Sequence, residues 1–192
     1  MQHLPTEPSR RIEDSARAEM AAHLSTQLWF SHAAEVVLIL LLLAVLQGEL
    51  SGRRVLWWAV VALVDTARGA AANLIDARRR RLHPVDHSYV RRNLPHWALF
   101  GATWGALPVV VGPDATPDAR WLSLVAVLAV ATALVVITAG WRLFFIAALG
   151  TMVGTVSLGF LTGALPGGVF PLLVFGFVVL VVRLHAAMHQ AL

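Results

Sequence analysis

Six long apolar stretches decide what this chain can fold into. Each is about 20 residues long, the length at which a helix crosses the hydrocarbon core of a bilayer, and they lie at 28–47, 55–74, 93–112, 119–139, 141–163 and 168–188. The chain of 192 residues is 58% hydrophobic, more than a soluble domain could hide from water. We therefore predict an all-α integral membrane bundle of six transmembrane helices in a lipid bilayer, with no room for a soluble catalytic domain.

The arginines predict how the spans are oriented. All 15 basic residues are arginine, and 11 of them fall on one side of the membrane when the six spans alternate in direction. An excess of basic residues marks the cytoplasmic side. We therefore expect both termini in the cytoplasm (N-in/C-in), with residues 1–27 as a cytoplasmic amphipathic lead segment. The net charge of +4 then reflects topology, and no nucleic-acid partner is expected.

Three ionisable side chains lie well inside the predicted spans. Glu35 and Arg68 are each about six residues from the cytoplasmic end of their helix, so their depths match, and Asp65 lies three residues before Arg68. Charged residues inside a membrane pair with one another or serve a function. We expect Arg68 to form an ion pair with Glu35, Asp65 or both. The pair would either fix the helix rotation or form a ligand-binding pocket floor or a switch.

Several histidines lie near the predicted cytoplasmic ends of the spans. Four of them are candidate metal or haem ligands: His32, His96, His185 and His189. His185 and His189 are four residues apart and could share a metal ion, whereas His32 with His96 or His185 could ligate haem from two helices. The other interpretation is that they are amphipathic anchors in the headgroup zone. The sequence alone identifies no cofactor.

Glycines four residues apart predict close helix contacts, because small residues let two backbones approach each other in lipid. The stretch "GATWG" supplies Gly101 and Gly105, and "GTMVG" supplies Gly150 and Gly154. Trp104 lies between the first two glycines and is the one tryptophan of seven that falls mid-span, while the other six fall at span ends, as in an aromatic belt. If the chain has a ligand pocket, we expect it against the Trp104 ring.

The motifs of common enzymes are absent from the sequence. It contains no GxSxG, no HExxH, no P-loop and no glycine-rich dinucleotide turn. No catalytic residue is therefore predicted. Apart from Arg120 at the very start of the fourth span, the outer halves of the predicted spans also carry no ionisable residue, which argues against ion transport.

Two further elements accompany the polar lead segment, the six short spans and the arginine-rich loop at 76–92. They are the stretch from Arg91 to "FGATWGALP" at the third span and "TAGWRLFFIAALG" at the fifth. Together they resemble the six-helix N-terminal membrane sensor domains of bacterial signalling proteins, whose third helix often carries a G-x-x-W-G element, matched here by Gly101, Trp104 and Gly105. The resemblance implies the bacterial cytoplasmic (inner) membrane, a homodimer, and a diguanylate cyclase (GGDEF) or histidine kinase output module after Leu192.

The expected function is therefore that of a transmembrane sensory domain. A stimulus would change the packing of helices one, two, three and six, and the sixth helix would pass the change to a cytoplasmic module that makes or controls cyclic-di-GMP. The candidate ligand-binding or switch residues are Glu35, Asp65, Arg68, His96 and Trp104. A haem- or metal-binding membrane protein and a small transporter subunit are the alternatives.

Overall fold

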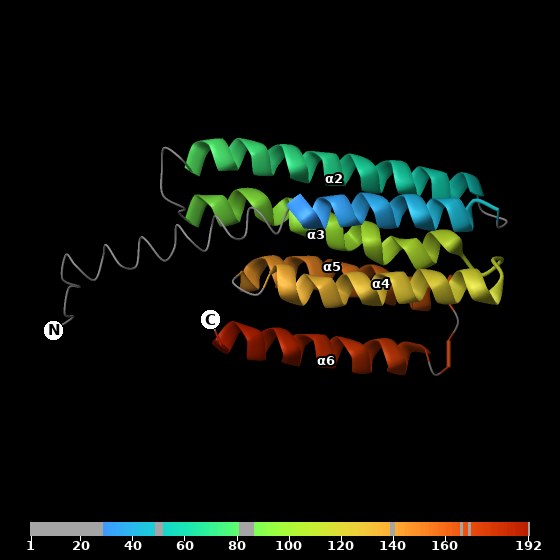
Figure 1. The fold of residues 1–192 in the computed structure, drawn as a ribbon. Helices are drawn as coiled ribbons and strands as arrows, with labels where there is room; N and C mark the ends of the chain where they lie inside the picture. Colours follow the sequence, from blue (N-terminus) through green and yellow to red (C-terminus); the bar gives the residue numbers. More distant parts are fainter. Residues whose placement is uncertain are drawn as a thin grey trace, which may run out of the picture.

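The computed structural model describes residues 29–48, 52–80, 87–138, 141–165, 167–168 and 170–191, which form six helices (Figure 1). The predicted lead segment at 1–27 lies outside the described residues. The helix at Trp29–Leu46, here called the first span, is followed by α2 (Gly52–Arg80), α3 (His87–Val111), α4 (Pro117–Ile137), α5 (Arg142–Leu161) and α6 (Phe170–Ala191).

The predicted all-α class with six membrane-spanning helices is confirmed. Each helix contains a stretch of at least 18 residues that is long and apolar enough to cross a membrane. Large apolar side chains such as Leu41, Val64 and Phe175 are exposed on the outer faces. A bilayer covers such faces, which a soluble protein would have to bury. The helices α2 and α3 run past the predicted spans to Arg80 and from His87.

The helices lie side by side, and α3 is the central one. It packs against α2, α4 and α5, while α6 packs against α4 and α5 at the edge of the bundle opposite α2 (Figure 1). The first span lies against α2, α3 and α4 through the contacts described below. The end of α2 and the starts of α3 and α5 lie at one end of the bundle, here called the basic end (Figure 1), and these helix ends carry Arg78, Arg91, Arg92 and Arg142.

The contact between α3 and α5 explains the glycines of "GATWG". A β-carbon added to Gly101 would overlap the carbonyl oxygen of Ala148, and one added to Gly105 would lie 2.6 Å from the carbonyl oxygen of Met152. Thr151 adds a hydrogen bond across the same contact, from Oγ1 to the carbonyl oxygen of Ala98 (2.7 Å). These two glycines therefore allow backbone-to-backbone packing, as predicted.

The same prediction is wrong for Gly150 and Gly154 within the described chain. Nothing lies within 4 Å of a β-carbon built on either residue, and both are exposed. The face of α5 that meets α3 is the one carrying Ala148, Thr151 and Met152. A four-residue spacing puts two glycines on one face, but it does not say whether that face points to a neighbouring helix or outward.

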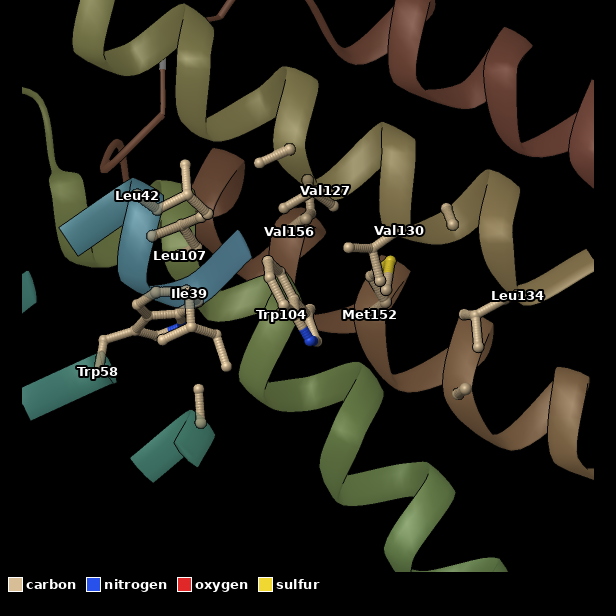
Figure 2. Packing of buried hydrophobic residues seen from close by; sticks show 14 of the residues in the cluster. Ile39, Leu42, Trp58, Trp104, Leu107, Val127, Val130, Leu134, Met152 and Val156 are labelled. Atoms are coloured by element: carbon tan, nitrogen blue, oxygen red, sulfur yellow. The ribbon is translucent and has the colours of Figure 1, made fainter. Parts of the chain in front are cut away.

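Some tryptophans that were expected in an aromatic belt at the membrane interface are buried in the core of the bundle instead. Trp104 is 1% exposed within a cluster that includes Ile39, Leu107 and Met152 (Figure 2). Trp58 was expected at an interface, but it is buried with its edge against Trp104 (centroids 5.4 Å apart, planes at 78°). Its indole Nε1 donates to the carbonyl oxygen of Thr103 (2.8 Å), and this hydrogen bond allows the indole to be buried.

The α2–α3 hairpin is closed at the basic end by a buried carboxylate. Asp76 accepts hydrogen bonds from the Arg92 guanidinium (2.6 Å) and from the Asn93 amide (3.1 Å). Both oxygens of Asp76 are thus paired with α3, so the hairpin has a fixed register.

Candidate functional site

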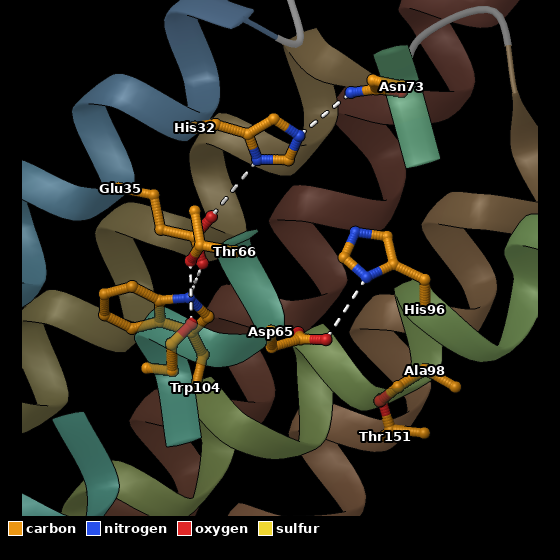
Figure 3. Close-up of polar contacts among 10 residues, drawn as sticks. His32, Glu35, Asp65, Thr66, Asn73, His96, Ala98, Trp104 and Thr151 are labelled. Atoms are coloured by element: carbon orange, nitrogen blue, oxygen red, sulfur yellow. Dashed lines mark hydrogen bonds and ion pairs between the residues drawn. The ribbon is translucent and has the colours of Figure 1, made fainter. Parts of the chain in front are cut away.

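Polar side chains from three helices meet inside the bundle, on the side of Trp104 that faces the basic end. We call this group the polar cluster (Figure 3), and its members are His32 and Glu35 of the first span, Asp65 and Asn73 of α2, and His96 and Trp104 of α3. Buried polar groups must find partners because an unpaired one costs free energy in a medium without water. The cluster therefore also fixes how the three helices are rotated.

Trp104 joins α3 to the first span. Its indole Nε1 donates to Oε1 of Glu35 at 3.0 Å. The other carboxylate oxygen, Oε2, lies 3.7 Å from Nδ1 of His32, which is beyond hydrogen-bond length. The mid-span tryptophan is therefore explained, because its ring fills the core and its N–H holds a carboxylate that is nine-tenths buried.

The two histidines of the cluster converge on Gly69 of α2. A β-carbon at Gly69 would lie 2.7 Å from Cε1 and Nε2 of His96 and 3.0 Å from Cε1 of His32. Only a residue without a side chain leaves room for both rings. His32 and His96, one of the two pairings considered for a metal or haem, therefore both lie against the same point of α2.

Each histidine ring has one nitrogen fixed by its partner. The amide nitrogen of Asn73 lies 3.0 Å from Nε2 of His32, and because an amide N–H can only donate, the proton of the neutral His32 ring is on Nδ1, toward Glu35. Nδ1 of His96 lies 3.3 Å from Oδ1 of Asp65, so that nitrogen also carries a proton. Two buried carboxylates thus each face the Nδ1–H of a histidine.

The expected ion pair of Arg68 is not formed. Arg68 is exposed and has no ion-pair partner among the residues that the structure describes. The buried face of α2 runs through Asp65, Gly69 and Asn73, and Arg68 lies beside that face. Histidines of the first span and α3 take the place that was expected for the guanidinium. Matching depth in two helices did not determine which way each side chain points.

Arg68→Ala is therefore expected to change the free energy of unfolding by less than about 0.5 kcal/mol, as is usual for an exposed residue without specific partners. Thermal unfolding in detergent measures this, with Asp65→Ala, which takes a buried carboxylate away from His96, as the destabilised comparison. A loss of about 3 kcal/mol in Arg68→Ala would instead show that the guanidinium is a buried ion-pair partner.

The histidines of α6 lie away from the polar cluster. His185 is 3% exposed, stacks on Phe145 (centroids 3.8 Å apart) and has its Nε2 3.2 Å from the carbonyl oxygen of Thr138. The His189 ring is parallel to it at 6.1 Å. Parallel rings do not aim their nitrogens at one point, so this pair does not make a shared metal site. No group of three or more metal-ligating side chains occurs in the described part of the chain.

A pocket of about 200 Å³ adjoins Glu35 and Trp104. The first span contributes Ser31, Ala34, Glu35 and Leu38, α3 contributes Phe100 and Trp104, and α4 contributes Ala129, Val130, Ala133, Leu134 and Ile137. A pocket is therefore present against the Trp104 ring, where a ligand pocket was expected. Of the sequence-predicted site residues, Glu35 and Trp104 line the pocket, whereas Asp65 and His96 lie in the polar cluster behind it.

Sequence reasoning missed several residues of this region. Asn73 was passed over because only ionisable residues were considered, although a lone amide inside a span carries the same signal of a buried polar contact. Phe100 and Thr138 have no distinguishing pattern, since their importance comes from helices that are distant in the sequence. Gly69 is a single glycine without a four-residue partner, so the packing motif did not include it.

Comparison of the chain with models of known protein families, with curated protein sequences and with solved structures gives no match.

Proposed function

We propose that this chain is the transmembrane sensory domain of a bacterial signalling protein in the cytoplasmic membrane. The basic end faces the cytoplasm, in keeping with the excess of arginine there. Occupancy of the pocket changes the position of α6, and α6 passes the change to a cytoplasmic output module after Leu192, a diguanylate cyclase in a homodimer. The sensory role rests on one structural link between the pocket and α6.

That link is the last turn of α4. Leu134 and Ile137 line the pocket, and the next residue, Thr138, has its carbonyl oxygen 3.2 Å from Nε2 of His185 on α6. A ligand that displaces the end of α4 therefore displaces the atom to which His185 is bonded. The sequence-based expectation named helices one, two, three and six as the helices whose packing changes, and the proposal adds α4 to them.

The α6 helix is packed loosely enough to change its position. Only 11% of its spanning stretch is buried, compared with 44% for α3 and for α4. Among the α6 residues whose burial the structure describes, Val181 and His185 are the buried ones. Elements with few buried contacts are the ones whose position changes at low cost in free energy. A sensory domain requires such an element with two positions that a ligand can bias.

A fusion to a diguanylate cyclase module tests the proposal. The module is joined after Leu192 through linkers that cover one heptad, and cyclic-di-GMP is measured in cells at matched protein levels. Ala133→Leu fills the pocket from its exposed rim, and His185→Ala removes the link to Thr138. Each is expected to change output by about fivefold or more, the usual size of an allosteric coupling. The control Ala44→Leu, on an exposed face of the first span outside the pocket, leaves output unchanged.

Equal output from all four fusions would reject the sensory role. The outcome depends on the coupling between pocket and α6, so it does not require the natural stimulus to be known. A change in the control Ala44→Leu as large as that in Ala133→Leu would also count against the proposal, because it would show a general effect of added apolar volume.

The haem or metal alternative is favoured by the convergence of His32 and His96 on Gly69. His96 fits that role, since Asp65 at Nδ1 leaves Nε2 as the free ring nitrogen. His32 fits poorly, because Nε2 is engaged by Asn73 and Nδ1 faces Glu35. The sensory proposal therefore predicts a colourless protein from haem-replete cells. A Soret band that is lost in His96→Ala would favour the alternative instead.

A further inference from the structure

The pocket opens toward the surrounding lipid. Ala34 of the first span and Ala129 and Ala133 of α4 belong to its wall and are exposed on the outer surface of the bundle. Small side chains at these positions leave the space between the two helices accessible from the side. A ligand that is soluble in the bilayer can therefore reach the pocket without crossing the bundle.

The size of the pocket limits the ligand. Its volume is about 200 Å³, whereas a dry engineered protein cavity of about 150 Å³ holds one benzene molecule. One aromatic ring or one trimethylammonium group therefore fills this space, and the rest of a slightly larger molecule lies in the mouth of the pocket, toward the lipid. A lipid chain with its headgroup is too large to be enclosed.

The charge in the pocket indicates which charge the ligand carries. Glu35 is the one ionisable residue among the described residues that line it. Oε1 is held by the neutral indole N–H of Trp104, and Oε2 faces Nδ1 of His32 at 3.7 Å, which is too long for a hydrogen bond. None of the described arginines forms an ion pair with Glu35. A carboxylate in this setting favours a positively charged ligand, because charges interact strongly where water is excluded.

Two aromatic rings stand beside that carboxylate. Phe100 and Trp104 both line the pocket, with centroids 6.4 Å apart and planes inclined by 49°. Inclined aromatic faces next to a carboxylate are the surroundings in which organic ammonium groups bind, since the ring faces attract cations without demanding hydrogen bonds. Apart from Ser31, the remaining wall is aliphatic and suits the alkyl or aryl part of such a molecule.

We propose that this pocket binds a small lipophilic organic cation, an alkyl- or arylalkylammonium that enters from the bilayer. The inference rests on the proposed sensory function and names the chemical class of its stimulus. The cationic nitrogen lies near Oε2 of Glu35 and against the faces of Phe100 and Trp104, and the apolar part lies along α4 toward Leu134. In that position the ligand touches the turn that leads to Thr138 and His185.

Equilibrium binding of tritiated benzyltrimethylammonium to the full chain in phosphatidylcholine nanodiscs tests the proposal. Empty nanodiscs supply the background, and neopentylbenzene, the same shape with carbon in place of the charged nitrogen, is the competitor. We expect saturable binding that is weakened by at least about tenfold in Glu35→Gln and in Ala133→Leu. Ala44→Leu binds like the wild type. Neopentylbenzene competes at least about tenfold less well than the unlabelled cation.

Absence of saturable binding, equal competition by neopentylbenzene, or unchanged binding in Glu35→Gln would each overturn the cation site. The amide introduced by Glu35→Gln keeps an oxygen that accepts from Trp104, so this variant is expected to fold. If Glu35→Gln does not fold, Ala133→Leu still tests the site, because it fills the pocket from outside the core. If the cation fails to bind while the cyclase fusion still responds to Ala133→Leu, the sensory function stands with another ligand. If the cation binds and that fusion does not respond, the binding site stands and the sensory function fails.

Discussion

Gly101→Ala is expected to destabilise the bundle more than any other single-methyl change in the described chain. The added β-carbon overlaps the carbonyl oxygen of Ala148 and comes too close to its carbonyl carbon, which lies 2.7 Å away. Both atoms belong to the backbone of α5, so no side-chain rotation can relieve the overlap. The α3 and α5 helices must move apart along the largest contact among the helices from α2 to α6. We expect a loss of about 3 kcal/mol, the upper part of the range for overpacking.

The matched control is Gly150→Ala on α5. It adds the same methyl group to a helical glycine, but nothing lies within 4 Å of the added atom. Because alanine is about 1 kcal/mol better than glycine inside a helix, this variant should be neutral or slightly stabilised. Thermal unfolding of both variants in one detergent gives the comparison. Equal melting temperatures for the two variants would contradict the close packing of α3 on α5.

Trp104→Ala is expected to have the second large effect, a loss of about 3–5 kcal/mol, as for other buried tryptophans replaced by alanine. The substitution empties a site that is 1% exposed and removes the edge contact with Trp58. It also leaves Oε1 of Glu35 without its donor. Trp57→Ala is the control, because Trp57 is 62% exposed and should contribute little to helix packing.

Trp104→Phe separates the ring from its hydrogen bond. Phenylalanine keeps most of the apolar volume and lacks the N–H, so we expect a loss of about 1–2 kcal/mol for an unpaired carboxylate oxygen. In the Glu35→Gln background, Trp104→Phe should lower the free energy of unfolding by a smaller amount, because an amide oxygen without a donor costs less than a carboxylate oxygen without one. A double-mutant cycle by thermal unfolding measures the difference. Independent, additive effects would show that Glu35 and Trp104 do not interact.

The helices could be predicted from the sequence because the bilayer imposes their length. A stretch of apolar residues must cover the hydrocarbon core, so hydropathy alone located all six spans to within a few residues of the helices in the structure. Depth also follows from sequence, which is why Glu35, Asp65, His32 and His96 were expected at similar levels. They do meet in one part of the bundle.

The rotation of each helix about its own axis could not be predicted in the same way. The expected Arg68 pair and the expected contact through Gly150 and Gly154 both failed for this reason, since each residue lies on a face that points outward. Rotation depends on which neighbouring helices pack against a given face, and α3 packs against three of them. The α3 glycines were correctly predicted to lie at a helix contact. This helix packs against three others, so a glycine on it is more often at a contact.

The link from the pocket through α4 to α6 is tested most directly by the distance between the basic ends of α5 and α6. The chain contains no cysteine, so spin labels on Leu143→Cys and Ala187→Cys, both at exposed positions, report one distance in nanodiscs that each hold a single chain. We predict that filling the pocket with Ala133→Leu shifts this distance distribution, and that adding His185→Ala abolishes the shift. The same distribution with and without Ala133→Leu would contradict the coupling of the pocket to α6.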